Sequence, residues 1–419
     1  MPRAAATFQH IPAPLLVLAA IAGIAPSALA QSFTLMGTLP TYTISQNTGL
    51  SADGIVAAGY HGGGGLVRGF TWSAANGRND FGANLPVAAY VTGISGNGQT
   101  VIGTRSNGNA QAFRWSQSDG YQTLGVLPGY LFSEGFDANF DGSIVVGTLS
   151  NGSGSEPQAF RWTQATGMQG LGFGTRAAAI SGDGSTIVGG TGSVGNRPFT
   201  WTSSAGMQFL TTLDGTSSGS ANGVNHDGTV MVGESGTAFR GTMWVNGVPL
   251  DITGGSTSAN FSPTGVDDVG SIVVGQLNAS GQSLTAGVWT ASTSLMRLSD
   301  YLIANGVTIP VGVALTNCTA VSADGRTFAG YTEGSMGRQG FVATIPTPCP
   351  ADLDNDGLFS NGGTRDRAVT IVDLLFLLAA FESGNLAADL DNGSNTGTRD
   401  NAVTIDDLLY FLTHFEAGC

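Results

Sequence analysis

The chain contains no lysine, so all 15 of its positively charged side chains are arginines. This absence excludes the site chemistries that depend on a lysine, such as the phosphate-binding P-loop, Schiff-base catalysis and the Ser-Lys pair of β-lactamases. Charged residues make up only 11% of the sequence, and the net charge is −14. Because phosphate recognition depends on clustered cations, we expect neither nucleic acid nor an anionic membrane as a partner.

Long hydrophobic runs are also scarce, and the one near the N-terminus, residues 15–24, is too short to span a bilayer permanently. It follows a single positive charge at Arg3 and precedes the small-residue site Ala28-Leu29-Ala30. This is the plan of a secretory signal, so we predict a signal peptide over residues 1–30 and an exported, extracellular or cell-surface chain with no transmembrane segment. The alternative is that the segment is retained as an anchor.

Only three cysteines occur: Cys318, Cys349 and the terminal Cys419. Export permits disulfides, and Cys349 and Cys419 bracket the last segment of the chain. If they pair, loop entropy predicts about 4 kcal/mol of stabilisation. Alternatively, Cys419 is free for attachment to another molecule.

Glycine, in contrast, is abundant, and 65 glycines accompany a phrase that recurs seven times between residues 50 and 343. Most copies have an Asx-Gly turn, a few β-prone residues, Val-Gly or Ala-Gly, and then Phe-x-Trp. One copy reads GISGNGQTVIG over residues 93–103 and QAFRW over residues 111–115. The tryptophans that mark six of the copies are Trp72, Trp115, Trp162, Trp201, Trp244 and Trp289. The seventh copy has Ala343 in the tryptophan position.

A period of about 40 to 45 residues with strand-forming composition is typical of four-stranded propeller blades. Two strands flank the Asx-Gly turn, the Phe-x-Trp stretch forms a third, and residues such as 120–124 form a fourth. We expect the recurrent tryptophans to pack between blades and not to bind ligand.

The seventh copy lacks a fourth strand, but residues 34–40 near the N-terminus match the fourth strand of the second copy, residues 123–128. We therefore predict an all-β fold, a seven-bladed β-propeller over residues 31–345 closed by the N-terminal strand, which removes exposed sheet edges. An open solenoid or a β-helix is the alternative.

These phrases resemble the HAF family of extracellular repeats, which is named for a His-Ala-Phe triplet. Gln111-Ala112-Phe113, Gln158-Ala159-Phe160 and Arg68-Gly69-Phe70 stand in that position, so the histidine is missing. The resemblance covers residues 33–345 and implies a secreted, propeller-like fold without an established reaction.

A different repeat follows the Pro-rich linker, residues 346–350. Residues 364–384 and 398–418 align with an offset of 34, and each is preceded by an acidic phrase, at 352–357 and 389–393. Crowded carboxylates repel one another unless a cation neutralises them, and Ca²⁺ prefers several oxygens on a loop that leads into a helix. The segment from Thr347 onward holds 12 acidic residues against three arginines.

This segment, residues 351–419, resembles dockerin modules, small α-helical units with duplicated EF-hand-like Ca²⁺ loops that bind cohesin domains. Carried over by motif, the ligands are Asp352, Asp354 and Asp373 in the first loop and Asp389, Asp391 and Asp407 in the second. An insertion leaves the middle ligand open. Counting back from each helix selects Asp366 and Asp400, which we prefer, and counting forward selects Asp356. The alternative, without a bound metal, is a solvated acidic loop or aspartates that cap helices.

Few residues suggest catalysis. His226 and His414 have no partners set by spacing, and His61 heads a glycine run that is only superficially like the oxyanion stretch of esterases. Gly215–Gly219 matches the GxSxG esterase pattern without a strand-turn-helix context. The acids of the propeller, such as Asp137, are expected mostly in turns.

We therefore expect a non-catalytic binding or scaffolding propeller, with a glycan as its candidate ligand, docked to an extracellular assembly through a Ca²⁺-dependent tail. The partner of the tail is expected to be a cohesin-like or other cell-surface protein. The alternatives are a secreted polysaccharide-acting hydrolase or lyase carried by the same tail, which would need clustered carboxylates in the central channel, and a purely structural surface-layer role.

Overall fold

The computed structural model describes residues 33–81, 88–106, 108–152, 156–191, 197–255, 259–279, 283–334, 337–346, 371–384, 386–394, 397–398, 400 and 402–417. The chain divides into two compact units. One is Gln31–Pro346, and the other contains the described residues after Thr347. Each unit is described by itself below.

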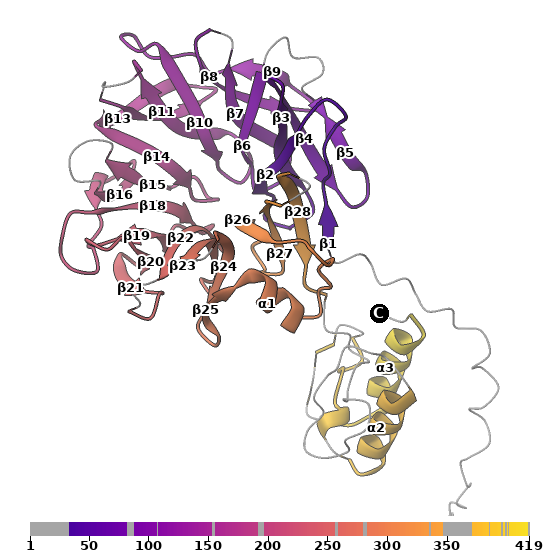
Figure 1. Cartoon of the computed structure of the whole chain (residues 1–419). Coiled ribbons are helices and arrows are strands. Elements are labelled where there is room, and N and C mark those ends of the chain that lie inside the picture. Colours follow the sequence, from indigo (N-terminus) through magenta and orange to yellow (C-terminus); the bar gives the residue numbers. More distant parts are fainter. Residues whose placement is uncertain are drawn as a thin grey trace, which may run out of the picture. The chain divides into compact units, whose positions relative to one another are not determined.

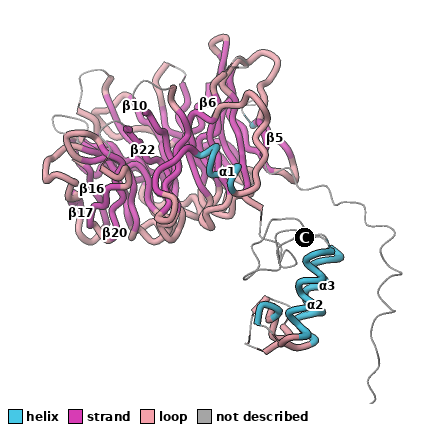
Figure 2. Tube along the Cα trace, turned by 60° about the horizontal axis from the view of Figure 1, so that its bottom comes forward, coloured by secondary structure: helices cyan, strands magenta, loops and turns pink. Residues whose placement is uncertain are grey.

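Seven four-stranded antiparallel sheets form the first unit (Figures 1 and 2). The first sheet contains β2 (Ile44–Leu50), β3 (Ala57–Gly63), β4 (Leu66–Ser73) and β5 (Gly77–Asp80). The second contains β6 (Ala88–Ile94), β7 (Thr100–Ser106), β8 (Gln111–Ser116) and β9 (Gly120–Thr123). The third contains β10 (Phe132–Ala138), β11 (Ile144–Ser150), β12 (Gln158–Thr163) and β13 (Gly167–Phe173). The fourth sheet contains β14 (Thr175–Ile180), β15 (Thr186–Thr191), β16 (Pro198–Thr202) and β17 (Gly206–Phe209). The fifth contains β18 (Gly219–Val224), β19 (Val230–Ser235), β20 (Arg240–Val245) and β21 (Val248–Asp251). The sixth contains β22 (Ala259–Val266), β23 (Ile272–Ala279), β24 (Thr285–Thr290) and β25 (Ser294–Arg297).

The seventh sheet joins the two ends of the propeller. Its order is β1-β28-β27-β26, with β26 (Leu315–Val321), β27 (Thr327–Thr332) and β28 (Gln339–Thr344) from the last repeat and β1 (Phe33–Leu35) from the N-terminal end. Phe33 pairs with Ala343 and Leu35 with Phe341, and the rings of Phe33 and Phe341 stack at 5.8 Å. The predicted seven-bladed propeller and its closure by the N-terminal strand are therefore confirmed, and the open solenoid is excluded.

Every first strand contains a β-bulge, and the repeated Val-Gly or Ala-Gly glycine lies opposite it. In the third blade the register between β10 and β11 shifts between Gly135 and Asp137. A Cβ atom at Gly147 would overlap the carbonyl oxygen of Glu134, and the equivalent glycine of each other blade meets the same obstacle. Seven bulges therefore explain why this glycine recurs in all seven copies.

The blade interiors are filled mainly by the phenylalanine of the Phe-x-Trp phrase. The fully buried ones are Phe70, Phe113, Phe160, Phe199 and Phe341. Trp244 is also completely buried and Trp162 nearly so, while the other tryptophans are half-buried against their neighbours. The prediction that the tryptophans pack between blades agrees with this burial.

A short helix, α1 (Leu298–Ala304), connects the sixth and seventh blades and was not predicted from the sequence. Its Leu298 and Leu302 are fully buried in the same cluster as Phe328 and Ala343. Ala343 replaces the tryptophan of the other copies, so the helix supplies apolar surface where the seventh blade lacks that ring.

The second unit contains α2 (Ile371–Glu382), the 3₁₀ turn η2 (Leu386–Ala388) and α3 (Ile405–Ala417). Its small core consists of Leu374, Leu377, Ala380, Ala388, Leu390, Tyr410 and Phe411. The helices follow the apolar spacing predicted from the duplicated segment. Of the helices in the described part of the chain, none has the length and apolar character needed to cross a membrane.

Candidate binding site in the central channel

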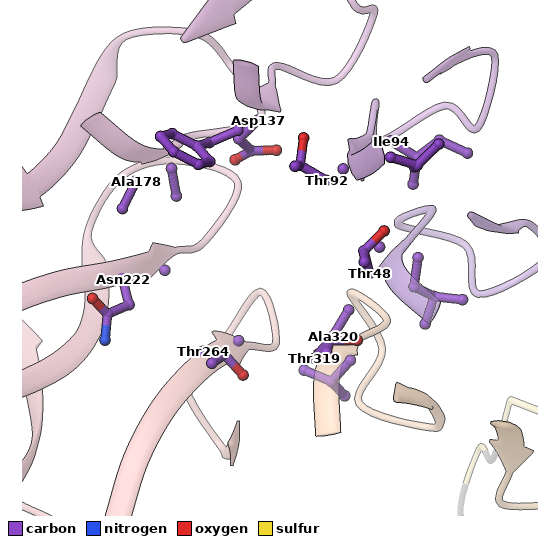
Figure 3. A pocket seen from close by; sticks show the side chains of 18 of the residues that line it. Thr48, Thr92, Ile94, Asp137, Ala178, Asn222, Thr264, Thr319 and Ala320 are labelled. Atoms are coloured by element: carbon purple, nitrogen blue, oxygen red, sulfur yellow. The ribbon is translucent and has the colours of Figure 1, made fainter. Parts of the chain in front are cut away.

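The seven first strands enclose a cavity of about 570 Å³ at the centre of the propeller (Figure 3). Each of β2, β6, β10, β14, β18, β22 and β26 contributes to its wall, and Tyr60 of β3 is the one lining residue from a second strand. A cavity of this size falls in the range of small-molecule sites. The channel is therefore the candidate functional site of the propeller.

The bulged residues of the seven first strands line the cavity at one level. We call them the bulge ring, and they are Thr48, Thr92, Phe136, Ala178, Asn222, Thr264 and Thr319. Four polar members donate a hydrogen bond to a carbonyl oxygen of the following blade. The distances are 2.7 Å from Thr92 to Gly135, 3.2 Å from Asn222 to Pro263, 2.8 Å from Thr264 to Cys318 and 3.3 Å from Thr319 to Asn47. The ring thus links neighbouring blades as well as lining the channel.

The third and fourth blades depart from this pattern, because Phe136 and Ala178 have no polar group to donate. Next to Phe136 lies Asp137, where the other six blades have only glycine or alanine, and its carboxyl group points into the opening in Figure 3. Its two oxygens accept backbone N–H groups, Oδ1 from Ala138 at 2.8 Å and Oδ2 from Ile180 at 3.0 Å.

Burial raises the pKa of Asp137 to about 7, although the two backbone N–H groups oppose the shift by stabilising the charged form. The expectation that the propeller acids occupy turns holds for Asp141, Asp183 and Asp227. It is wrong for Asp137, which lies in β10, and for Asp251, the last residue of β21. Aligning the seven first strands would have found it, because a carboxylate replaces glycine or alanine at this position.

One end of the channel, which we call the tyrosine end, carries the aromatic residues Tyr60 and Tyr90. Their rings meet edge to face at 5.4 Å, and Tyr90 is 41% exposed. Gln46 lines the cavity beside them and accepts a hydrogen bond of 2.9 Å from Arg338, whose guanidinium lies over the Tyr331 ring at 4.5 Å. Blades seven, one and two thus place aromatic rings next to planar amide and guanidinium groups at this end.

The other end, which we call the turn end, has a smaller cavity of about 140 Å³. Its rim consists of the residues just before the Asx-Gly turns, Ala52, Gly96, Phe140, Gly182, His226, Asp268 and Ala323. Hydrogen bonds connect each turn to the next around the complete circle, for example from Ala52 N to Gly96 O at 2.8 Å and from Ala323 N to Ala52 O at 2.8 Å. Between the fifth and sixth blades the amide of Asn225 donates to Asp268 O at 2.9 Å.

The remaining candidates for catalysis do not come together. His61 is fully buried inside the first blade, with Nε2 at 3.5 Å from Asp80, and burial with the nearby Arg78 lowers its pKa to about 4. His226 packs edge to face on Phe140 at the turn end. Ser217 lies in the loop between β17 and β18, outside any strand-turn-helix arrangement.

In the tail, the described acids of the second predicted calcium loop lie close together. Asp389 and Asp391 are 2% exposed and Asp407 is fully buried. Asp407 accepts backbone N–H groups from both ends of the loop, from Asp391 at 2.8 Å and from Thr404 at 2.7 Å. The N–H of Asp400 donates to Asp389 at 3.3 Å, so the chain after the insertion returns to the start of the loop.

Part of this arrangement is helix capping. Thr404 precedes α3, its hydroxyl accepts the N–H of Asp406 at 3.3 Å, and Asp407 bonds back to the N–H of Thr404. This is a capping box, so Asp407 has a structural role whether or not it binds a cation. Over the described residues, no group of three or more His, Cys, Asp or Glu side chains is arranged as a metal site.

Several sequence-based predictions fall outside the described residues. They concern Asp352, Asp354, Asp356 and Asp366 of the first loop, the side chain of Asp373, Cys349, Cys419 and the signal peptide. Cys318 is a free, buried thiol in β26.

No protein-family model and no curated protein matches the chain. The resemblances to HAF repeats and to dockerins therefore remain predictions. Solved structures do match. The β-propeller domain of the trilobed protease from Pyrococcus furiosus is 10% identical, with a TM-score of 0.51, and the match covers 77% of this chain and 100% of that one.

The fold is that of a β-propeller. A structure from an analysis of two prolyl endopeptidases is 10% identical with a TM-score of 0.50, and the match covers 75% of this chain and 52% of that one, about half its length. An oligogalacturonate lyase from Vibrio parahaemolyticus is 10% identical with a TM-score of 0.49, over 75% and 97% of the two chains. At these identities the likeness shows the fold alone. The Pyrococcus domain has an open Velcro topology, whereas β1 closes the ring here.

Proposed function

We propose that this protein is an exported, non-catalytic binding propeller that takes its ligand in the central channel. The observation that carries the proposal is the lining of the cavity, which combines threonine, asparagine and tyrosine side chains with a single carboxyl group, that of Asp137. Glycoside hydrolysis ordinarily requires a pair of carboxyl groups on either side of the bond. The described cavity lining offers one, which favours binding over hydrolysis.

A glycan is the ligand class that the tyrosine end supports best. Tyrosine rings stack on the apolar faces of sugars, and amide and guanidinium groups such as those of Gln46 and Arg338 bind hydroxyl groups. Binding aromatics are expected at a few positions and not in every blade, and this description fits Tyr60 and Tyr90 better than the recurrent tryptophans.

A glycan array probed with the purified chain tests this proposal. We expect Tyr90→Ala to weaken the bound signal about tenfold or more, since it removes an exposed stacking face. Phe209→Ala is the matched control, because Phe209 is 47% exposed on β17, the strand farthest from the channel in its sheet. An array signal that Tyr90→Ala leaves intact contradicts glycan stacking at the tyrosine end, and no signal at all contradicts glycan binding.

A polysaccharide-acting enzyme is the second candidate, and the carboxyl group of Asp137 favours it. With a pKa of about 7 this group is suited to exchange protons near neutral pH. Release of reducing or unsaturated ends from a polysaccharide panel, abolished in Asp137→Asn, would support the enzyme over the binder.

For the tail, we propose Ca²⁺ binding by Asp352, Asp354, Asp366 and Asp373 in the first loop and Asp389, Asp391, Asp400 and Asp407 in the second. Carboxylate oxygens are the ligands that Ca²⁺ prefers, and three of the four acids of the second loop are buried, where a bound cation would offset their mutual repulsion. The backbone contact between Asp400 and Asp389 supports Asp400 as the middle ligand.

The two units can be followed separately in the intact protein, because all six tryptophans lie in the propeller, and α2 and α3 of the tail are longer than α1, the helix of the propeller. We expect EDTA to lower the melting temperature of the helical circular-dichroism signal and to leave the tryptophan fluorescence transition in place. Asp391→Asn should remove the Ca²⁺ effect, whereas Asp406→Asn, an exposed acid in the first turn of α3, should not. An unchanged helical melt with and without Ca²⁺ would remove the metal proposal and leave capping as the role of these acids.

We further propose that the tail docks on a cohesin-like or other cell-surface protein. Leu375 and Leu409, at equivalent positions of the two repeats, are 50% and 55% exposed, so the tail presents the same apolar side chain twice. Titration with purified cohesin domains in Ca²⁺ tests the proposal, with Leu409→Asp as the disruptive variant and Leu386→Asp, equally exposed but not repeated, as its control. Export is tested by sequencing the N-terminus of the secreted protein, which we expect at Gln31.

A further inference from the structure

The channel contains one formal charge that nothing in the described propeller neutralises. The cavity lining is otherwise made of uncharged residues, and Asp137 belongs to none of the five described ion pairs. Its position is also unique among the blades. Six blades have glycine or alanine at this position, and one blade has a carboxyl group. The repeat pattern is therefore broken at a position that lines the cavity, which suggests a role in ligand binding.

We infer that the channel selects a glycan that carries a protonated amine, that is, a cationic amino-sugar oligomer, with Asp137 as the counter-ion. The inference rests on the proposed binding function and specifies its ligand class. One carboxylate oxygen accepts the N–H of Ala138 and the other that of Ile180, so the carboxyl group is held in place before ligand arrives. Burial disfavours the negatively charged form of Asp137, and a bound ammonium group would stabilise that form by pairing with the carboxylate.

The chemistry of the cavity favours an organic cation over a metal ion. A divalent metal needs several hard oxygen ligands, whereas the described lining of this cavity supplies one carboxylate, and Asp268 lines the smaller cavity at the turn end. The described residues contain no group of three or more His, Cys, Asp or Glu side chains placed to hold a metal. A cavity of about 570 Å³ is also much larger than an ion. The rings of Tyr60 and Tyr90 at the tyrosine end and of Phe136 next to Asp137 add faces on which sugars and ammonium groups are both stabilised.

Among the described residues, no charged side chain forms an ion pair with Asp137, and its described hydrogen bonds are with backbone N–H groups. The charged or titratable groups on strands packed against β10, or on β10 itself, are Tyr90 of β6, Arg105 of β7, Arg114 of β8, Arg176 of β14 and Glu134 of β10. Arg105 donates to Gln111 and Arg114 pairs with Asp119, so these two guanidinium groups are directed elsewhere. At the turn end, His226 and Asp268 line the smaller cavity together with Asp137.

The test compares two ligands with the same sugar backbone, the glucosamine hexamer with free amines and its fully N-acetylated, uncharged counterpart, by calorimetric titration of the full chain at one pH near neutrality. We expect the wild type to bind the amine form at least about tenfold more tightly, a difference that a partly buried ion pair supplies. Asp137→Asn should lose this preference and bind the acetylated hexamer as the wild type does. The acetylated hexamer therefore reports whether the variant is still folded and competent.

Three outcomes would overturn the inference. The wild type binds the two hexamers equally, or it binds neither, or Asp137→Asn keeps the preference for the amine form. In each case the proposed binding function is judged separately by the array and Tyr90→Ala, because that test does not depend on the charge of the ligand. If Tyr90→Ala leaves the array signal intact while the amine preference is found, the stacking role of the tyrosine end is wrong and the counter-ion role of Asp137 stands.

Discussion

The two levels of the channel follow different rules. At the turn end every blade repeats the same device, a short polar side chain before the turn and a hydrogen bond to the next turn, so that the circle is complete. In the bulge ring, Phe136 and Ala178 replace the polar side chains of the other blades, and Asp137 lies next to Phe136. Features that all seven blades share build the propeller, whereas features that one blade changes are candidates for function. Four experiments can break or sharpen this distinction.

The largest effect is expected at the shared glycine of the second strands. Gly147→Val would force a side chain into the carbonyl group of Glu134, and we expect a loss of about 3 to 5 kcal/mol in the free energy of unfolding. Gly334→Val is the control, because a Cβ there meets no atom within 4 Å and the residue is exposed. Urea unfolding measures both, and equal midpoints would show that the bulge tolerates a side chain.

A second experiment asks whether every unshared residue matters for function. His61 is an unshared residue, but it is buried inside a blade and away from the channel. Burial lowers its pKa from 6.5 to about 4, so the unfolded chain binds the proton more readily. The contribution of His61 to stability is complete above pH 6.5 and falls by about 3 kcal/mol as the pH drops through 4.

We expect His61→Leu, which copies the residue of the third blade, to flatten the stability profile between pH 6.5 and 4 without changing ligand affinity. Thermal melts across this range measure the first effect and titration the second. A loss of ligand binding in His61→Leu would show that unshared residues inside a blade also shape the channel.

Asp137 should show the opposite pH dependence. Burial raises its pKa from 3.8 to about 7, so the folded state holds the proton more tightly. The contribution of the Asp137 proton to the free energy of unfolding is complete below pH 3.8 and is lost as the pH rises through 7. Partial exposure of the carboxyl group to the channel limits this contribution to about 1 to 2 kcal/mol. Relative to wild type, Asp137→Asn should gain stability at pH 8 and little at pH 4. Parallel melting curves at both pH values would contradict the raised pKa.

The smallest effect is expected in the bulge ring itself. Thr92→Val removes a hydrogen bond of 2.7 Å to the next blade and should cost about 1 kcal/mol. Thr48 has a single contact of 3.4 Å within its own blade, so Thr48→Val should be close to neutral. Differential scanning calorimetry compares the two, and equal losses would mean that the links between blades do not depend on these hydroxyl groups.

Much of the propeller could be predicted from the sequence because its information is repeated. Seven copies of one phrase specify four strands each, and the match between residues 34–40 and 123–128 predicted the closing strand, which forms at Phe33–Leu35. The helix α1 escaped prediction because it occurs once, in a connection that no other copy shares. Its role becomes clear only when Leu298 and Leu302 are seen to pack beside Ala343.

The candidate site was harder to predict, because it depends on which residues face the axis. Sequence patterns placed the acids of the propeller in turns, and the periodicity of β10 does not reveal that Asp137 faces a cavity. Tyr60 and Tyr90 lie on different strands of adjacent blades, so only the fold brings them together. In the tail, the motif predicts Asp389, Asp391, Asp400 and Asp407 as calcium ligands, and the alternative that these aspartates cap helices agrees with the hydrogen bonds of Asp407 at the start of α3.

The pairing of β1 with β28 also bears on how the chain folds. The first described strand and the last strand of the propeller are neighbours, so the final sheet cannot be completed until nearly the whole propeller has been synthesised. Such a distant contact brings a large loop-closure entropy, which slows the final step of folding. Until then β28 exposes an unpaired edge, and a second chain that offers its own N-terminal strand would find a ready template there.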